Sequence, residues 1–199
     1  MVDDLHRAIR LSRLTVGWNS VVGLAAVATA ILTSSLSLIG FGVTAVVDSS
    51  VSVLLIRRFV HEREGRHEHA ERGERLALRA AAIAFLLIAA YLTVQSIRAL
   101  ADAHHPEQSV FGIVEALCSL IVLPFLATKK FGVARRLGSR ALRADSLLTW
   151  FGTGLAAVTC LALLLVRFVG WWWSDAVGAL LIAGALTLEG VRSLRADED

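Results

Sequence analysis

The sequence predicts an all-α integral membrane protein whose six transmembrane helices form one bundle. Hydrophobic residues make up 56% of the 199 residues, and the mean hydropathy is +0.65. Charged residues make up only 19%, and they gather in a few blocks. Between these blocks lie apolar runs of about 20 residues, the length at which a helix crosses a hydrocarbon core of about 30 Å. A soluble domain of this size does not have such a composition.

The predicted spans are separated by short links. The sequence "TSSLS" (33–37) predicts a tight turn, and "ADAHHPEQ" (101–108) contains a proline. The stretch "RFVGWWWSD" (167–175) places three tryptophans where an interfacial aromatic belt is expected. Residues 1–13 are expected to form an amphipathic cytoplasmic lead-in, residues 14–194 the transmembrane domain, and residues 195–199 a tail. The predicted spans are 14–33, 38–56, 76–100, 110–128, 147–166 and 171–188.

The positions of Lys and Arg predict how the bundle is oriented. Basic blocks at residues 7–13, 57–79, 129–143 and 192–195 all fall on one side of an alternating path of six spans. Because cytoplasmic loops carry the excess of Lys and Arg, both termini are expected in the cytoplasm, with the bundle in a bacterial cytoplasmic membrane. The pI near 9.4 then points to the lipid bilayer as partner and not to nucleic acid. The sequence has no Gly-rich phosphate loop and no Ser/His/Asp arrangement, so we expect no enzyme.

One carboxylate, Asp48, lies in the middle of the second span. An ionised side chain there costs about 2.5 to 3.5 kcal/mol on insertion scales, so it must face the protein interior and needs a partner, a proton or water. Thr44 and Ser52 lie one turn before and after Asp48, which places three oxygen-bearing side chains on one helix face. The functional interpretation is a cation site. The alternative is a protonated Asp48 that hydrogen-bonds a neighbouring helix and serves packing alone.

A second carboxylate, Asp145, lies at the predicted cytoplasmic mouth of the fifth span, and Thr149 lies one turn deeper. Spans two and five run in opposite directions. If they pack side by side, Ser52 and Thr149 fall between the depths of Asp48 and Asp145 and complete an oxygen-lined ladder, which suits divalent cations. The alternative for Asp145 is a helix N-cap or an acid in the first helical turn.

Two further acids have simpler interpretations. Asp175 follows the tryptophans at the start of the sixth span, where a carboxylate caps a helix N-terminus, so we expect a structural role. Glu115, inside the fourth span, stays open between interhelical hydrogen bonding and function.

Taken together, these features resemble the cation diffusion facilitator family. The resemblance rests on six spans with cytoplasmic ends, an acidic position in span two, "SRALRAD" before span five, and "WWWSDAVGALLIAGALTLEGVRSLR" as span six, and it covers about residues 14–194. It implies a cation-efflux-like bundle that forms a homodimer and exchanges divalent metal for protons. It also implies a tetrahedral metal site between spans two and five. A compact six-helix branch without the family's cytoplasmic C-terminal domain is the expected match.

The family's ligand pattern is only partly matched. Its Asp-x-x-x-Asp of span two falls on Thr44 and Asp48, so one carboxylate has become a hydroxyl. Its His-x-x-x-Asp of span five, aligned through "RAD", falls on Leu148 and Gly152, so both of those ligands are absent. A site with one carboxylate and several hydroxyls holds zinc more weakly than the tetrahedral set does.

A second metal site is predicted in the sequence "HEREGRHEHAERGER", residues 61–75, which we expect to be a cytoplasmic loop. His61, His67 and His69 lie there among five glutamates. Imidazole suits zinc and other transition ions, and the resemblance implies a metal in a His-containing loop at this place. The alternative is a solvated, mixed-charge helical segment.

The predicted function is efflux of a divalent metal cation, with zinc as the first candidate and iron or manganese as others, by antiport with protons. The predicted site consists of Thr44, Asp48, Ser52, Asp145 and Thr149. Two alternatives stay open: a membrane protein that binds metal or regulates a partner without moving ions, and a purely structural subunit.

Overall fold

The computed structural model describes residues 2–63, 67–103, 107, 109–138 and 140–195. Within its helices, the side chains outside the description are those of residues 2–5, 51, 54, 55, 57–63, 67–78, 80, 81, 140, 141 and 144.

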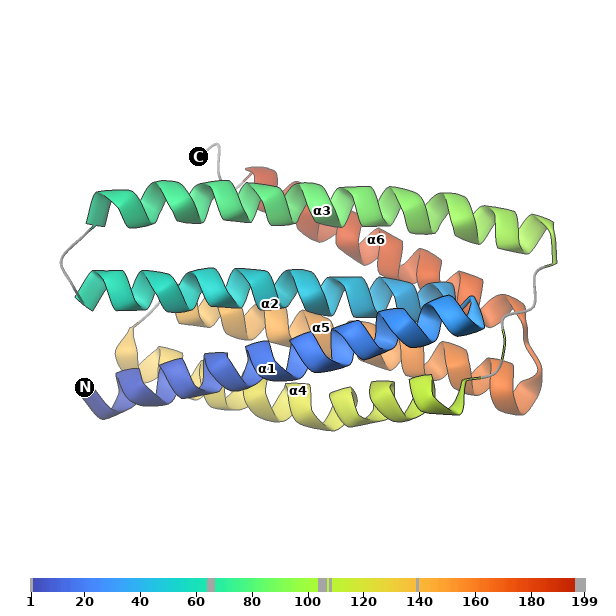
Figure 1. The fold of residues 1–199 in the computed structure, drawn as a ribbon, viewed down its shortest axis with the longest axis horizontal. Coiled ribbons are helices and arrows are strands. Elements are labelled where there is room, and N and C mark those ends of the chain that lie inside the picture. Colours follow the sequence, from blue (N-terminus) through green and yellow to red (C-terminus); the bar gives the residue numbers. More distant parts are fainter. Residues whose placement is uncertain (1, 64–66, 104–106, 108, 139, 196–199) are drawn as a thin grey trace.

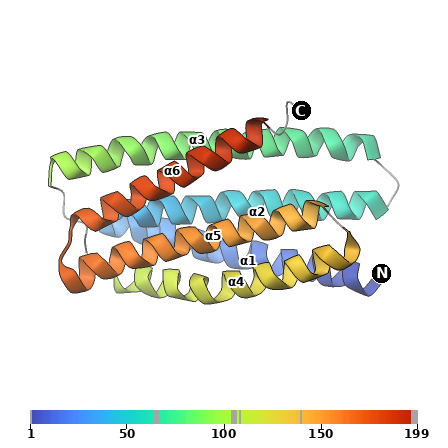
Figure 2. The same ribbon diagram turned by 180° about the vertical axis from the view of Figure 1, so that it is seen from behind.

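The described residues form a bundle of α-helices with one π-helical turn, labelled η1 (Figures 1 and 2). Among the described residues, five helices are long and apolar enough to cross a membrane, and the described apolar part of α2 is shorter (36–50). The protein is therefore an all-α membrane bundle, as predicted. The elements are α1 (Val2–Thr33), α2 (Leu36–Arg63), α3 (His67–Ala101), α4 (Val110–Leu137), α5 (Arg140–Leu164), η1 (Leu165–Val169) and α6 (Trp173–Arg195).

The α2 helix lies at the centre of the bundle, where it contacts α1, α3, α5 and α6. The α1 helix also contacts α4, and α4 packs along α5. Figure 2 shows α5 running along α2 in the opposite chain direction. Spans two and five are therefore neighbours, which is the arrangement that the predicted oxygen ladder requires.

The helices are longer than the predicted spans. The α1 helix has no boundary at residue 13, so the expected lead-in forms the first turns of the same helix. The bounds expected for the loop at 61–75 are wrong, because α2 continues to Arg63 and α3 begins at His67. At about 1.5 Å per residue, helices of 28 and 35 residues extend beyond a hydrocarbon core.

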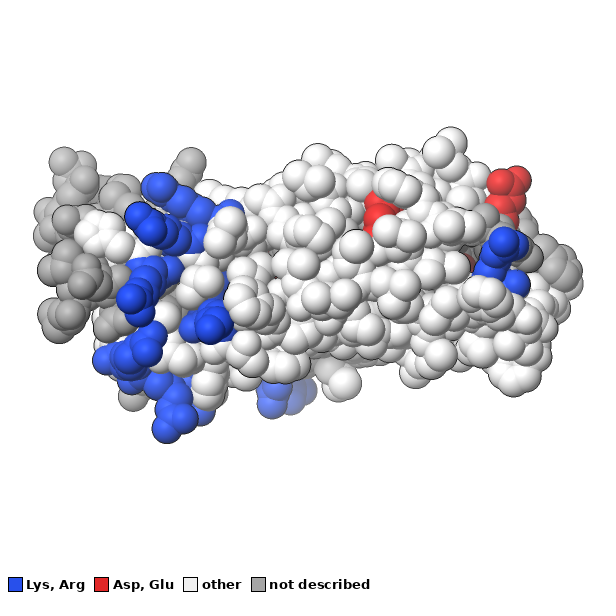
Figure 3. Space-filling model, turned by 90° about the horizontal axis from the view of Figure 1, so that it is seen from below, with Lys and Arg blue, Asp and Glu red and all other residues white. Residues whose placement is uncertain are grey.

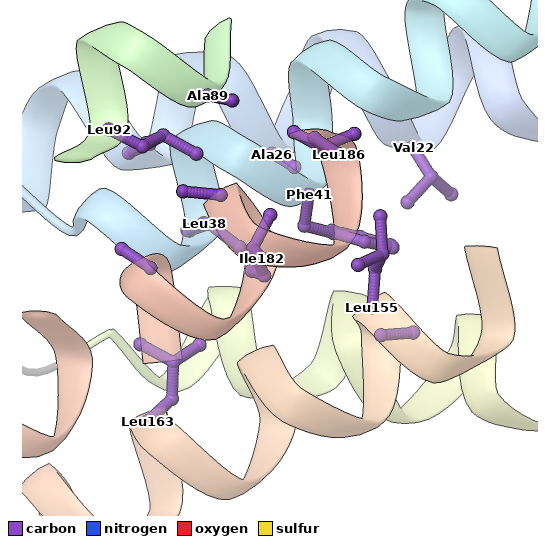
Figure 4. Close-up of a cluster of buried hydrophobic side chains, with 14 of the residues drawn as sticks. Val22, Ala26, Leu38, Phe41, Ala89, Leu92, Leu155, Leu163, Ile182 and Leu186 are labelled. Carbon is purple, nitrogen blue, oxygen red and sulfur yellow. The ribbon is translucent and has the colours of Figure 1, made fainter. Parts of the chain in front are cut away.

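Close backbone contact fixes α1 against α2. A Cβ atom added to Gly23 would lie 2.9 Å from the Gly42 carbonyl oxygen, and one added to Gly42 would lie 2.9 Å from the Gly23 carbonyl oxygen. Without a hydrophobic driving force between helices in lipid, small residues of this kind let the backbones make direct van der Waals contact. Beside this contact lies an apolar core to which α1, α2, α3, α5 and α6 contribute, and Figure 4 shows Phe41 of α2 meeting Leu155 of α5 there.

Asp175 caps α2, although it lies in the first turn of α6. Its buried carboxylate accepts hydrogen bonds from the backbone N–H groups of Leu36 (2.7 Å) and Ser37 (3.4 Å), and from the hydroxyls of Ser35 and Ser37. The hydrogen bonds agree with the expected structural role of Asp175, but the helix whose N–H groups it accepts from is α2, at the centre of the bundle. The start of α2 follows the turn at Ser34, where φ is 55°, and the Asp175 hydrogen bonds place it against the start of α6.

Basic side chains gather at the end of the bundle where α1 begins and α4 ends, which we call the basic end (Figure 3). They include Arg7, Arg10, Lys129 and Arg136, which line a pocket of about 480 Å³ between α1 and α4. The surface between the basic end and the opposite end is almost entirely uncharged in this view. This distribution agrees with the predicted clustering of Lys and Arg on one side.

Replacing Asp175 by alanine is expected to destabilise the bundle by about 3 kcal/mol, because it leaves buried N–H groups at the α2 N-terminus without their charged acceptor. Thermal unfolding of the purified protein in detergent measures this change. Asp175→Asn is expected to lie between the wild type and the alanine variant. Asp102→Asn, which alters an exposed acid, is the control, and equal melting temperatures for all four proteins would contradict the capping role.

Candidate cation site

Asp48 lies in the α2–α5 interface and is 6% exposed. Its Oδ1 atom is buried and has no hydrogen-bond partner among the described residues. On the α5 side it faces Gly152, where an added Cβ atom would lie 3.6 Å from Asp48 Oδ2. Burying an oxygen without a hydrogen-bond partner costs free energy. In the working protein, Asp48 therefore needs a partner or a proton beyond the contacts among the described residues.

The two hydroxyls that flank Asp48 on α2 have different partners. Thr44 is buried and donates its hydroxyl proton to the carbonyl of Gly40 in its own helix (2.7 Å), which leaves its oxygen lone pairs as acceptors. Ser52 is buried and donates to Asp145 Oδ1 of α5 (2.9 Å). Ser52 therefore joins α2 to α5 at the place where the ladder between Asp48 and Asp145 is predicted.

Asp145 already has a counterion inside the protein. The ammonium Nζ of Lys130, on α4, lies 2.7 Å from Asp145 Oδ2, and the two side chains are 0% and 2% exposed. The N-cap alternative for Asp145 is wrong, because α5 begins five residues earlier, at Arg140. Asp145 instead lies in the second turn of α5, with its carboxylate pointing into the bundle.

Three hydroxyls complete the surroundings of this ion pair. Ser12 of α1 donates to Asp145 Oδ2 (3.3 Å), and Ser52 donates to the other carboxylate oxygen. Thr149 accepts from Lys130 Nζ (3.3 Å) and donates to the Asp145 backbone carbonyl (2.9 Å). Side chains from α1, α2, α4 and α5 thus meet at one buried pair of charges. This is how burial of both ions is stabilised, since a buried pair needs hydrogen bonds on its remaining atoms.

The charges at the α2–α5 interface do not cancel. Asp48 interacts electrostatically with Asp145 and Lys130, and also with Glu189 of α6, whose negative charge acts in the same direction as that of Asp145. At the α2–α5 interface itself, the charged groups are Asp48, Asp145 and Lys130. Two carboxylates and one ammonium carry a net charge of −1 when all are ionised. This arrangement can accept one further positive charge at Asp48, in a setting of carboxylate and hydroxyl oxygens.

The tetrahedral ligand set of the family is not reproduced. Within the part of the chain that the structure describes, no three His, Cys, Asp or Glu side chains lie close enough together to hold a metal ion. Gly152, as aligned from the sequence, faces Asp48, but it brings no ligand atom. The available donors are oxygen atoms, which suit harder or more loosely bound divalent ions than a Zn²⁺ site with imidazole ligands does.

The structure brings Ser52, Asp145 and Thr149 into one network and places Asp48 beside Gly152 of α5 in the same interface. The predicted second site falls on His61, His67 and His69, whose side chains lie outside the described residues. That site stays a prediction.

The sequence reasoning missed Lys130 and Ser12. Lys130 lies in the basic block 129–143, which we used only to predict the orientation of the bundle in the membrane. Its helical phase is the signal that could have found it: Lys130 follows Leu123 and Leu126 by seven and four residues and shares their buried face, whereas Lys129 is exposed and lies over the Phe125 ring.

Glu115 is a separate buried acid on α4. It is 6% exposed, and both its carboxylate oxygens lack hydrogen-bond partners among the described residues. The Thr29 side chain of α1 lies beside it without meeting hydrogen-bond geometry. Ser119, one turn away, also has a buried hydroxyl without a partner. The interhelical hydrogen bond that one alternative expected for Glu115 is thus not formed among the described residues.

The fold and the buried charges define a multi-pass α-helical membrane protein with ionisable groups directed into the bundle, a pattern typical of ion pathways. The chain belongs to the cation efflux family, since the family model for the cation efflux transmembrane domain matches residues 12–197. No curated protein sequence matches the chain. Membership supports a cation transporter in a membrane, and the family implies divalent metal cations as its substrates.

Replacing Gly152 by aspartate is expected to tighten divalent-metal binding by about tenfold, because it adds a second carboxylate next to Asp48. The space exists, since the nearest atoms to an added Cβ are Asp48 Oδ2 at 3.6 Å and Leu123 Cδ1 at 3.7 Å. Titration of the purified protein with Zn²⁺ and Mn²⁺ measures the affinity. Gly152→Asn has nearly the same volume without the charge, and a similar gain in that variant would rule out the proposed pairing.

Proposed function

We propose that the protein exports a divalent metal cation in exchange for protons and that Asp48 is the residue that binds both. The observation that carries this proposal is the buried Asp48 carboxylate inside a cation efflux domain: its Oδ1 has no hydrogen-bond partner among the described residues, and its Oδ2 faces Gly152 of α5. A carboxylate with a protein partner would serve packing. Asp48 has no such hydrogen-bond partner among the described residues, which supports a cation or a proton as the group that satisfies it.

The proposed site uses oxygen ligands from two helices. Thr44, Asp48 and Ser52 contribute from α2, and Asp145 and Thr149 contribute from α5. Because hydroxyls are weak ligands, the bound ion is expected to keep part of its water shell. Zinc, iron and manganese are the candidate substrates, and an oxygen-rich site favours manganese or iron(II) over the tight tetrahedral binding that zinc prefers.

The proposed mechanism is alternating access. The ion enters from the basic end, where both termini are proposed to face the cytoplasm, and passes Asp145 before it reaches Asp48. A change in the packing of α2 against α5 then opens the site to the other side. A proton and a metal ion compete for the same Asp48 oxygens, so protonation from outside releases the ion, and loss of that proton inside prepares the next cycle.

The proposed assembly is a homodimer in a bacterial cytoplasmic membrane. Exposed apolar side chains cover the outside of the bundle, as expected for a lipid-facing surface, and glycine and alanine on helix faces suit close helix contacts. The His-rich segment around His61, His67 and His69 is proposed to raise the metal concentration at the entrance.

A second candidate function is metal binding or partner regulation without ion movement. One observation favours it: Asp145 is neutralised by Lys130, so the ligand set lacks a second free carboxylate.

The two functions are separated by flux measurements in proteoliposomes that contain a metal-sensitive dye. Transport predicts metal entry with the wild type, and a reduction of about tenfold or more with Asp48→Asn, since an amide cannot neutralise a divalent cation. Glu107→Gln, at an exposed site, is the control and is expected to behave as the wild type. Metal binding without flux in the wild type would support the second candidate. If Asp48→Asn changes neither binding nor flux, the assignment of Asp48 is wrong.

A further inference from the structure

We infer that Lys130 is a tethered cation that occupies the Asp145 end of the site and that a divalent ion has to displace it. This inference rests on the proposed function. It adds the residue that determines which charge an ion must carry to bind at both carboxylates. The geometry that points to it is the buried contact between Lys130 Nζ and Asp145 Oδ2 at 2.7 Å.

Lys130 holds the same atoms that a metal ion would need. Its ammonium contacts the Asp145 carboxylate and the Thr149 hydroxyl, which are two of the five predicted ligands. A compact ammonium on a flexible stem behaves as a point charge at such a site. A divalent ion bound by Asp145 and Thr149 would have the ammonium as an immediate neighbour of like charge. The two cations therefore exclude each other from Asp145.

Packing alone does not explain a lysine at this position. The neighbours of Lys130 on the buried face of α4, among them Leu126, Ala127 and Ala134, are apolar. A well-packed apolar side chain at residue 130 with a neutral one at residue 145 would hold α4 and α5 together at least as well, because a buried ion pair loses the hydration of both partners. What the ion pair adds is a positive charge that is covalently attached to α4 and is therefore not lost when it leaves Asp145.

The displaced ammonium has a place to go. Lys130 lies seven residues before the end of α4 at Leu137, which corresponds to about 10 Å along the helix axis. The Lys stem would carry its charge only part of this distance toward the basic end, while its apolar part stays between α4 and α5. Arg135 and Arg136 are exposed at that end, so solvent is available to the charge there.

The exchange sets a charge rule for the site. With Lys130 on Asp145, only Asp48 is left to be balanced, and one positive charge suffices. When Lys130 leaves, Asp48 and Asp145 together balance a divalent ion. A monovalent ion cannot compensate for both carboxylates, so only a divalent ion displaces Lys130, and the ammonium returns to Asp145 after that ion departs.

The test is metal binding by Lys130→Met, which keeps the apolar stem and removes the charge. We expect Zn²⁺ and Mn²⁺ to bind about tenfold or more tightly than to the wild type, because Asp145 is then free. The double variant Lys130→Met/Asp145→Asn is expected to lose this gain. Lys129→Met changes the exposed neighbour and is the matched control, which should bind as the wild type. Unchanged or weaker binding by folded Lys130→Met overturns the inference.

A second variant covers the case in which Lys130→Met does not fold. Lys130→Arg keeps the positive charge and can bond both Asp145 oxygens with its planar fork, so it should weaken metal binding and slow flux. Tighter or unchanged binding by this variant also overturns the inference.

The failure of the inference and the failure of the proposed function give different results. If Asp48→Asn abolishes binding but Lys130→Met does not tighten it, the role of Asp48 stands and that of Lys130 falls. If Lys130→Met tightens binding and the gain persists after Asp48→Asn is added, the ion sits at Asp145. The role of Lys130 then stands, and the proposed role of Asp48 falls.

Discussion

The ion pair between Lys130 and Asp145 is the contact on which the candidate cation site depends. It is buried, and hydroxyls of Ser12 and Ser52 bring α1 and α2 to the carboxylate that α5 presents to α4. Two charges in a low-dielectric interior tolerate few geometries, so the pair fixes the relative positions of the helices that carry it. Asp48, one turn from Ser52 on α2, lies at the same interface, and its Oδ1 has no hydrogen-bond partner among the described residues.

Much of the fold could be predicted because lipid imposes simple rules on sequence. Runs of apolar residues and blocks of basic residues are sufficient to place spans and links. Helix ends were predicted less well, because the helices continue into polar sequence such as that around His61 and His67. Hydropathy measures where the hydrocarbon ends, and a helix has no need to end at the same residue. The sequence predicted that Asp175 caps a helix but not that this helix is α2, since a carboxylate can cap a helix that is distant in sequence.

The candidate site shows where single-sequence reasoning fails. Asp48 and Asp145 stand out, because carboxylates near apolar runs are rare, and the spacing of Thr44, Ser52 and Thr149 follows from helical periodicity. Lys130 could not be separated from its basic neighbours by composition. Its role depends on which face of α4 packs against α5, and that is a property of the tertiary structure.

The glycine contact between α1 and α2 has a consequence for motion. Gly23 and Gly42 bring the two backbones so close that an added Cβ atom at either position would clash, so α1 and α2 pack as a tight pair. The α4 and α5 helices are joined in turn by the Ser146 hydroxyl, which donates to the Ala127 carbonyl at 2.9 Å. The bundle thus contains two stiff pairs, and the boundary between them passes through the carboxylates. In the proposed mechanism, shear along this boundary would change the number of oxygen ligands available to an ion without unfolding either pair.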